Sequence, residues 1–212
     1  CGAQTATANN SPITVLGLAN GVPVTCTVIA TNSSGPSLAS VPSNTVTPAT
    51  VPGQPTGVTA TAGNAQVSVA FTAPVNNAGS AILSYSAQCG GPSFTGATSP
   101  IVVTGLTNGT PVSCTVIASN AVGNSAASAP SNTVVPATVP NAPTSVVATA
   151  GAGQVSVSFT APGNNGGSSI TGYTATCGAQ SNSGVSAPIV VSGLVNGVAV
   201  TCTVIATNSV GN

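Results

Sequence analysis

Hydrophobic and small polar residues alternate in short runs along the whole chain. The clearest run is QVSVAFT at residues 66–72, where valine or phenylalanine occupies every second position. This alternation predicts half-buried β-strands, because successive side chains of a strand point to opposite faces. Clusters of Gly, Pro and Asn separate the runs at spacings of about 8 to 12 residues, which is typical of sandwiches and barrels. No segment shows helical periodicity.

The chain is also built of repeats. The segment TCTVIATN at residues 25–32 returns unchanged at 201–208 and as SCTVIASN at 113–120, and the intervening sequence keeps the same 88-residue period. Repetition of this length indicates tandem modules. The repeat divides the chain into a partial module (1–48), a complete module (49–136) and a module lacking its last strand (137–212). Either the chain is an excerpt of a longer array, or another chain completes its first module.

The complete module has seven short strand patterns, a number that favours a β-sandwich. They are expected near residues 57–62, 66–72, 82–89, 94–97, 101–106, 110–119 and 132–135. The linkers ATVPGQP (49–55) and ATVPNAP (137–143) each contain two prolines. Proline restricts the backbone to extended geometry, so we expect semi-rigid joints and a rod-like array.

The order of these segments resembles a fibronectin type III domain, especially the bacterial, secreted, Thr- and Ser-rich kind. The resemblance is carried by VSVSFTAP (155–162), SITGYTATC (169–177) and IVVSGLVNGVAVTCTVIATNSVGN (189–212). It implies an all-β fold of tandem seven-stranded immunoglobulin-like β-sandwiches. The sequence departs from the family at its usual core Trp and at its corner tyrosine, where it has Phe71 and Phe159, and Val24, Val112 and Val200.

The resemblance places the third and sixth strands side by side, with their cysteines facing inward. It therefore implies three disulfides: Cys1–Cys26, Cys89–Cys114 and Cys177–Cys202. Each would close about 25 residues and contribute about 3 kcal/mol in the chain-entropy model, and disulfides indicate an extracellular or cell-surface location. Zinc binding is the alternative use of cysteine, but two cysteines per module without His or CxxC spacing make a poor tetrahedral site.

The chain contains no Lys, Arg, Asp, Glu or His among its 212 residues. Nucleic acid is excluded as a partner, because phosphate binding depends on Lys and Arg. Acid–base catalysis needs a titrating side chain and a hydroxyl nucleophile needs a base, so we expect no enzyme activity, no cofactor and no metal site. No apolar run reaches the roughly 18 residues of a membrane span, so we expect no membrane insertion.

The absence of charge also removes the repulsion that keeps copies of a protein apart. On the repeated strand, alternation places one row of uncharged side chains outward in every module. We expect this putative self-contact face to comprise Thr27, Ile29, Thr115, Ile117, Thr203 and Ile205. The simpler interpretation is that Thr and Ile favour strands and that single exposed apolar residues are normal.

These patterns predict a structural extracellular repeat protein that forms a stalk, sheath or filament by homotypic association. The alternative is a spacer or binding segment of a large secreted adhesin or polysaccharide-degrading enzyme, with cell-surface polysaccharide as a partner. A third possibility is binding of ice or another crystalline surface by the threonine rows. The interrupting isoleucines and the sheet twist argue against a flat lattice match.

Overall fold

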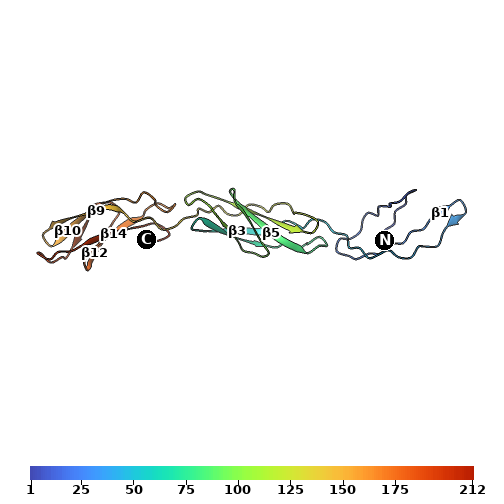
Figure 1. Ribbon diagram of the computed structural model, residues 1–212, viewed down its shortest axis with the longest axis horizontal. Helices are drawn as coiled ribbons and strands as arrows, with labels where there is room; N and C mark the ends of the chain where they lie inside the picture. The colour runs from blue at the N-terminus through green and yellow to red at the C-terminus, as the bar shows by residue number, and fades with distance from the viewer.

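The computed structural model describes residues 1–212 and contains strands, turns and loops but no helix. Three modules follow one another along an elongated molecule, with the first module at one end and the third at the other (Figure 1). The chain is therefore all-β, and its modules are arranged as an extended row. No helix in the structure is long and apolar enough to cross a membrane.

The middle module consists of two antiparallel three-stranded sheets. One sheet has the order β3 (Thr56–Gly63), β4 (Gln66–Thr72), β7 (Ile101–Thr104). The other has the order β6 (Ser93–Gly96), β5 (Ile82–Cys89), β8 (Cys114–Asn120). This is the immunoglobulin-like β-sandwich expected from the sequence.

The third module repeats this architecture. Its first sheet has the order β13 (Ile189–Ser192), β10 (Gln154–Thr160), β9 (Thr144–Gly151). Its second sheet has the order β12 (Gln180–Gly184), β11 (Gly172–Cys177), β14 (Cys202–Thr207). The fold class, tandem β-sandwiches, is thus confirmed.

The core between the two sheets is made mainly of aliphatic residues. In the middle module Val67, Val103 and Val116 are completely buried, and one aromatic pair, Phe71 with Tyr85, has ring centroids 4.8 Å apart. The third module has the equivalent pair of Phe159 and Tyr173, at 4.7 Å. Each complete core therefore depends on many aliphatic contacts and on a single aromatic contact.

Two predicted strands of the middle module, 66–72 and 82–89, have the observed bounds. Others are shorter than predicted. Strand β7 ends at Thr104 because Gly105 follows in the left-handed region, with φ of 77°. Strand β8 begins only at Cys114, and Val112 before it makes an isolated bridge to Val134. The predicted seventh strand at 132–135 is represented by that one bridge.

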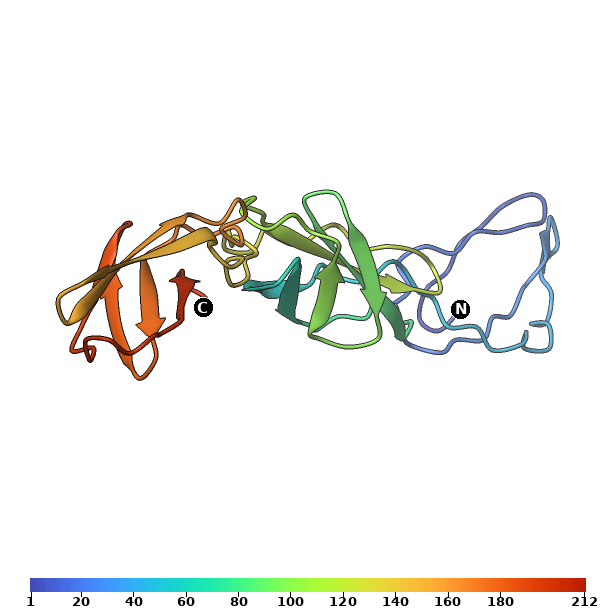
Figure 2. The same cartoon turned by 60° about the vertical axis from the view of Figure 1, so that its left-hand side comes forward.

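The first module is the least regular of the three. It contains only the two-residue strands β1 (Thr31–Asn32) and β2 (Gly35–Pro36) and an isolated bridge between Val24 and Val46. Figure 2 shows it as long loops with little strand. Val28 is 55% exposed, whereas its equivalent Val116 in the middle module is completely buried. Val28 is exposed because no second sheet lies against the segment that contains it.

Candidate functional site: disulfides, serine arms and module joints

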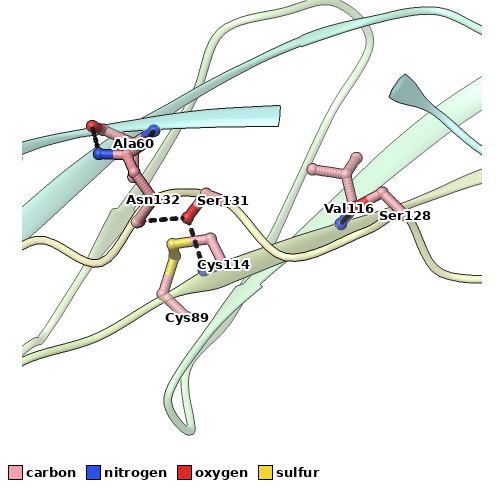
Figure 3. The surroundings of a disulfide bond; sticks show 7 residues. All are labelled: Ala60, Cys89, Cys114, Val116, Ser128, Ser131 and Asn132. Carbon is pink, nitrogen blue, oxygen red and sulfur yellow. Dashed lines mark hydrogen bonds between the residues drawn. A yellow bond between two sulfur atoms is a disulfide. The ribbon is translucent and has the colours of Figure 1, made fainter. Parts of the chain in front are cut away.

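The six cysteines form three disulfides, Cys1–Cys26, Cys89–Cys114 and Cys177–Cys202, and none is free. In the middle module Cys89 and Cys114 lie directly opposite each other on β5 and β8, with Cα atoms 4.3 Å apart and no exposed surface (Figure 3). The bond therefore joins the third and sixth strands within one sheet and also fills the core.

The free edge of β8 is covered by an irregular segment that we call the serine arm, residues 125–132. Its serines recur every third residue. The backbone amides of Ser125, Ser128 and Ser131 donate to the carbonyls of β8 at 2.8, 2.9 and 2.8 Å. The arm therefore follows the strand as a seventh strand would, but with a period of three residues in place of two.

The serine side chains complete this pairing. The backbone amide of Cys114 donates to Oγ of Ser131 at 3.0 Å (Figure 3), and Val116 donates to Oγ of Ser128 at the same distance. Each serine hydroxyl in turn donates to the carbonyl of the next residue, as Ser131 does to Asn132 at 2.8 Å. The short side chain thus replaces the backbone carbonyl of a regular strand and leaves no buried polar atom unpaired.

The last residue of the arm joins the two sheets of the sandwich. The amide side chain of Asn132 donates to the carbonyl of Ala60 on β3 at 3.0 Å and accepts from its backbone N–H at 2.9 Å (Figure 3). This pair imitates the two hydrogen bonds that neighbouring residues exchange in an antiparallel ladder. Because Ser131 is bonded to β8 and Asn132 to β3, the arm closes the open side of the sandwich.

The first module has the same arm at residues 37–44, along the segment 26–30, which is equivalent to part of β8 but is not assigned as a strand. Ser37, Ser40 and Ser43 donate their backbone amides at 2.8 to 2.9 Å and accept the strand amides at 3.0 to 3.1 Å. Asn44 has no strand such as β3 to pair with. Our strand predictions missed this element, although the signal was present as SLASVPSN and SAASAPSN.

The joints between modules are contacts between glycines. At the second joint, the backbone amide of Gly109, in an Asn-Gly turn of the middle module, donates to the carbonyl of Pro136 at 2.8 Å. Gly167 of the third module lies against this turn. A Cβ atom added to Gly167 would lie 2.7 Å from the backbone carbonyl carbon of Asn108. The first joint repeats the arrangement with Gly21, Pro48 and Gly79. Because only a hydrogen atom separates the two backbones, each joint requires glycine on the later module.

Asparagines hold both partners of a joint in place. On the earlier module, Asn108 accepts the amide of Ala65 at 2.8 Å, which fastens the Asn-Gly turn to the turn between β3 and β4. On the later module, the side-chain amide of Asn208 donates to the carbonyls of Thr138 and Asn165 at 2.7 and 2.8 Å. The linker and the glycine loop are therefore fixed to the body of the later module.

The outward row of the repeated strand occupies a different surface. Ile29 is 55% exposed and Ile205 43% exposed, whereas Ile117 is half-buried. Thr27 and Thr203 are exposed and Thr115 is half-buried. Contact of this face with another copy stays a prediction.

The surface hollows differ in their lining, and the one formed by residues 6–11, 13 and 28–31 of the first module has six hydrophobic residues. The groove beside the second joint, formed by residues 107–110 and 164–169, has no hydrophobic side chain. No group of three or more His, Cys, Asp or Glu side chains gathers anywhere in the structure. Every buried side-chain N or O atom has a hydrogen-bond partner. The organised features of the molecule are the disulfides, the serine arms and the glycine contacts at the joints.

No protein-family model and no curated protein matches the chain. Among solved structures it is similar to titin domains, with 26% identity over 43% of this chain and 35% of that chain and a TM-score of 0.40. It is also similar to the FN1–FN3 domains of chicken CNTN1, with 19% identity over 93% of this chain and 73% of that chain and a TM-score of 0.40. The chain spans about a third of the titin structure. The two packed sheets of each complete module define the fold.

Proposed function

We propose that this chain is a structural segment of an extracellular or cell-surface array, forming a stalk, sheath or filament by homotypic association. The observation that supports the proposal is the joint, in which a glycine of the later module, Gly79 or Gly167, lies against the Asn-Gly turn of the earlier module at both boundaries. A backbone-to-backbone contact at equivalent glycines restricts the angle between neighbouring modules in a similar way at each boundary. Repetition of one fixed step produces a straight or helical rod.

The disulfides support the location, since disulfides persist in oxidising compartments and are rare in the cytosol. The absence of charge supports association. With no Lys, Arg, Asp or Glu on any surface, copies meet without electrostatic repulsion, and salt has no ion pairs to screen. The structural role thus requires neither a ligand nor a cofactor.

Sedimentation velocity of the purified chain at increasing concentration, in low and in high salt, tests the proposal. We expect assemblies that grow with concentration and are insensitive to salt. A chain that stays monomeric at all concentrations would instead indicate a spacer segment of a larger secreted adhesin or polysaccharide-degrading enzyme.

A further inference from the structure

The contact at the second joint falls on the bond between Asn108 and Gly109. A Cβ atom added to Gly167 would lie 2.7 Å from the backbone carbonyl carbon of Asn108 and 2.8 Å from its Cβ. The third atom that it would meet is the backbone nitrogen of Gly109. Gly167 of the third module therefore covers neighbouring atoms of one Asn-Gly pair in the middle module.

An Asn-Gly pair can react with itself. The backbone nitrogen of the glycine attacks Cγ of the asparagine side chain, a new C–N bond forms, and the side-chain nitrogen leaves as ammonia with the proton that the glycine nitrogen loses. One water molecule then opens the resulting succinimide ring and gives aspartate or isoaspartate. Glycine permits the attack because it has no Cβ beside its nitrogen. The ring would contain Cβ and the carbonyl carbon of Asn108 and the nitrogen of Gly109, which are the atoms that Gly167 covers.

Hydrogen bonds hold both reacting groups of this pair. The backbone amide of Gly109 donates to the carbonyl of Pro136 at 2.8 Å, and the attack requires that amide to lose its proton. The side-chain oxygen of Asn108 accepts the backbone amide of Ala65 at 2.8 Å, and its side-chain nitrogen donates to Oδ1 of Asn64 at 2.8 Å. Cγ of Asn108 therefore cannot turn onto the nitrogen of Gly109 unless these bonds break.

Water, the other reactant, has access to the pair. The groove beside the joint, formed by residues 107–110 and 164–169, is lined only by polar residues and glycine, and Gly109 is exposed. Packing and hydrogen bonding, not the exclusion of water, therefore restrain the reaction.

We propose that Asn108 is a deamidation site whose rate the second joint controls. While the joint is closed the pair reacts slowly, and when the joint opens the pair is free to form the ring. Isoaspartate routes the main chain through Cβ and Cγ and so lengthens it by one carbon atom, at a place where Gly167 leaves no room for an added atom. The modified joint therefore stays open. The proposal goes beyond the proposed function and does not depend on association between copies.

Asn196, which is also followed by glycine, provides an internal reference. Its side chain accepts the backbone amide of Gly153 at 2.8 Å, as the side chain of Asn108 accepts that of Ala65. Nothing lies within 4 Å of a Cβ atom added to Gly197, so no module covers this second pair. The two pairs therefore share the side-chain bond and differ in the contacts of the joint.

The test incubates the folded 212-residue chain at mildly alkaline pH and follows deamidation of each peptide by mass spectrometry. Pepsin serves for the digestion, because the chain has no Lys or Arg for trypsin. We expect Asn108 to react at least about tenfold more slowly than Asn196, as for a joint that is open less than about a tenth of the time. In urea the two pairs should react at similar rates. Equal rates in the folded chain would overturn the proposal.

Two variants separate the joint from general stability. Gly167→Ala should raise the rate at Asn108 toward that of the reference pair. Gly105→Ala should leave the rate at Asn108 unchanged, because nothing lies within 4 Å of its added Cβ. No rise in Gly167→Ala, or an equal rise in Gly105→Ala, would contradict control by the joint.

Small-angle X-ray scattering tests the effect of the product on the joint. A chain deamidated in urea and refolded can be fractionated by anion exchange, because each event adds a carboxylate to a chain without charged side chains. The fraction whose digest shows isoaspartate at residue 108 alone should have a broader distribution of molecular dimensions than the unmodified chain. An identical distribution would overturn the claim that the modified joint stays open. All these measurements use dilute chains, so a failure of self-association would leave them unchanged.

Discussion

Replacement of Gly167 by alanine should loosen the joint between the second and third modules without unfolding either. The added Cβ would lie 2.7 Å from the carbonyl carbon of Asn108 and 2.8 Å from its Cβ, where ordinary contact begins at 3.4 Å. The modules must therefore separate by about 0.7 Å or more at this point, which removes the close contact of the two backbones. Since backbone of the earlier module, not a flexible side chain, opposes the new atom, local adjustment cannot absorb the change.

A second cost arises within the third module. Gly167 has φ of 87°, a conformation that costs an L-residue about 1–2 kcal/mol. For a module of this size we expect the melting temperature to fall by about 4–8 °C per kcal/mol. Gly105→Ala is the matched control, because Gly105 has φ of 77° but nothing lies within 4 Å of its added Cβ.

The assay combines hydrogen exchange at the amide of Gly109 with small-angle X-ray scattering. Gly109 donates to Pro136 at the joint, and in Gly167→Ala we expect faster exchange there and a broader distribution of molecular dimensions. Gly105→Ala should lose a similar amount of thermal stability and keep the slow exchange and the narrow distribution. Identical joint exchange and scattering in the two variants would refute the role assigned to the glycine contact.

The remaining predictions concern the arm, the charge and the outer face. Asn132→Ala should lower the free energy of unfolding of the middle module by about 1–3 kcal/mol in urea, because it leaves the backbone amide and carbonyl of buried Ala60 unpaired. The control Asn44→Ala removes no bond to a strand and should leave stability unchanged. Equal effects of the two substitutions would contradict the bridging role of Asn132. The free energy of unfolding measured by chemical denaturation should be nearly constant between about pH 3 and 8, because the chain has no acidic or basic side chain that could bind or release a proton on unfolding. A steep dependence of the unfolding free energy on pH would contradict this expectation. Lysine at Ile29, Ile117 and Ile205 should reduce lateral association in sedimentation while the circular dichroism spectrum is retained, and unchanged association would exclude this face.

The sandwich was predictable because its strands have the simplest periodicity. In β4, alternation placed Val67 and Phe71 inward, and both are buried. The observed pairing of Cys89 with Cys114 corresponds to the pairing implied by the resemblance. The inward positions follow from local alternation in the sequence. The cysteine pairing follows from the strand order that the resemblance implies.

The serine arm was missed for a physical reason. Its side chains repeat every three residues, and a search for alternation finds nothing there. Only the contacts show that the Oγ of Ser128 takes the place of a backbone carbonyl opposite Val116. The sequence does contain the spacing, so a search for Ser-x-x-Ser-x-x-Ser after a buried strand would find the arm.

The joints could not be predicted from local pattern. Gly109 lies in an Asn-Gly pair, and Gly167 lies in the glycine-rich segment GNNGGSS at residues 163–169. Nothing in either segment indicates that the two backbones touch across a module boundary. Their contact depends on the orientation of whole modules, which the linker prolines restrict but do not determine.

Electron microscopy of the assembled material, washed in high salt and then treated with a reductant, tests the central claim most directly. We expect long fibres with an axial repeat of one or two module lengths that persist in salt, because glycine joints and uncharged contacts need no ion pairs. Reduction should then weaken them as the disulfides open. Dispersed, flexible strings before reduction would contradict both the fixed joints and the self-assembly.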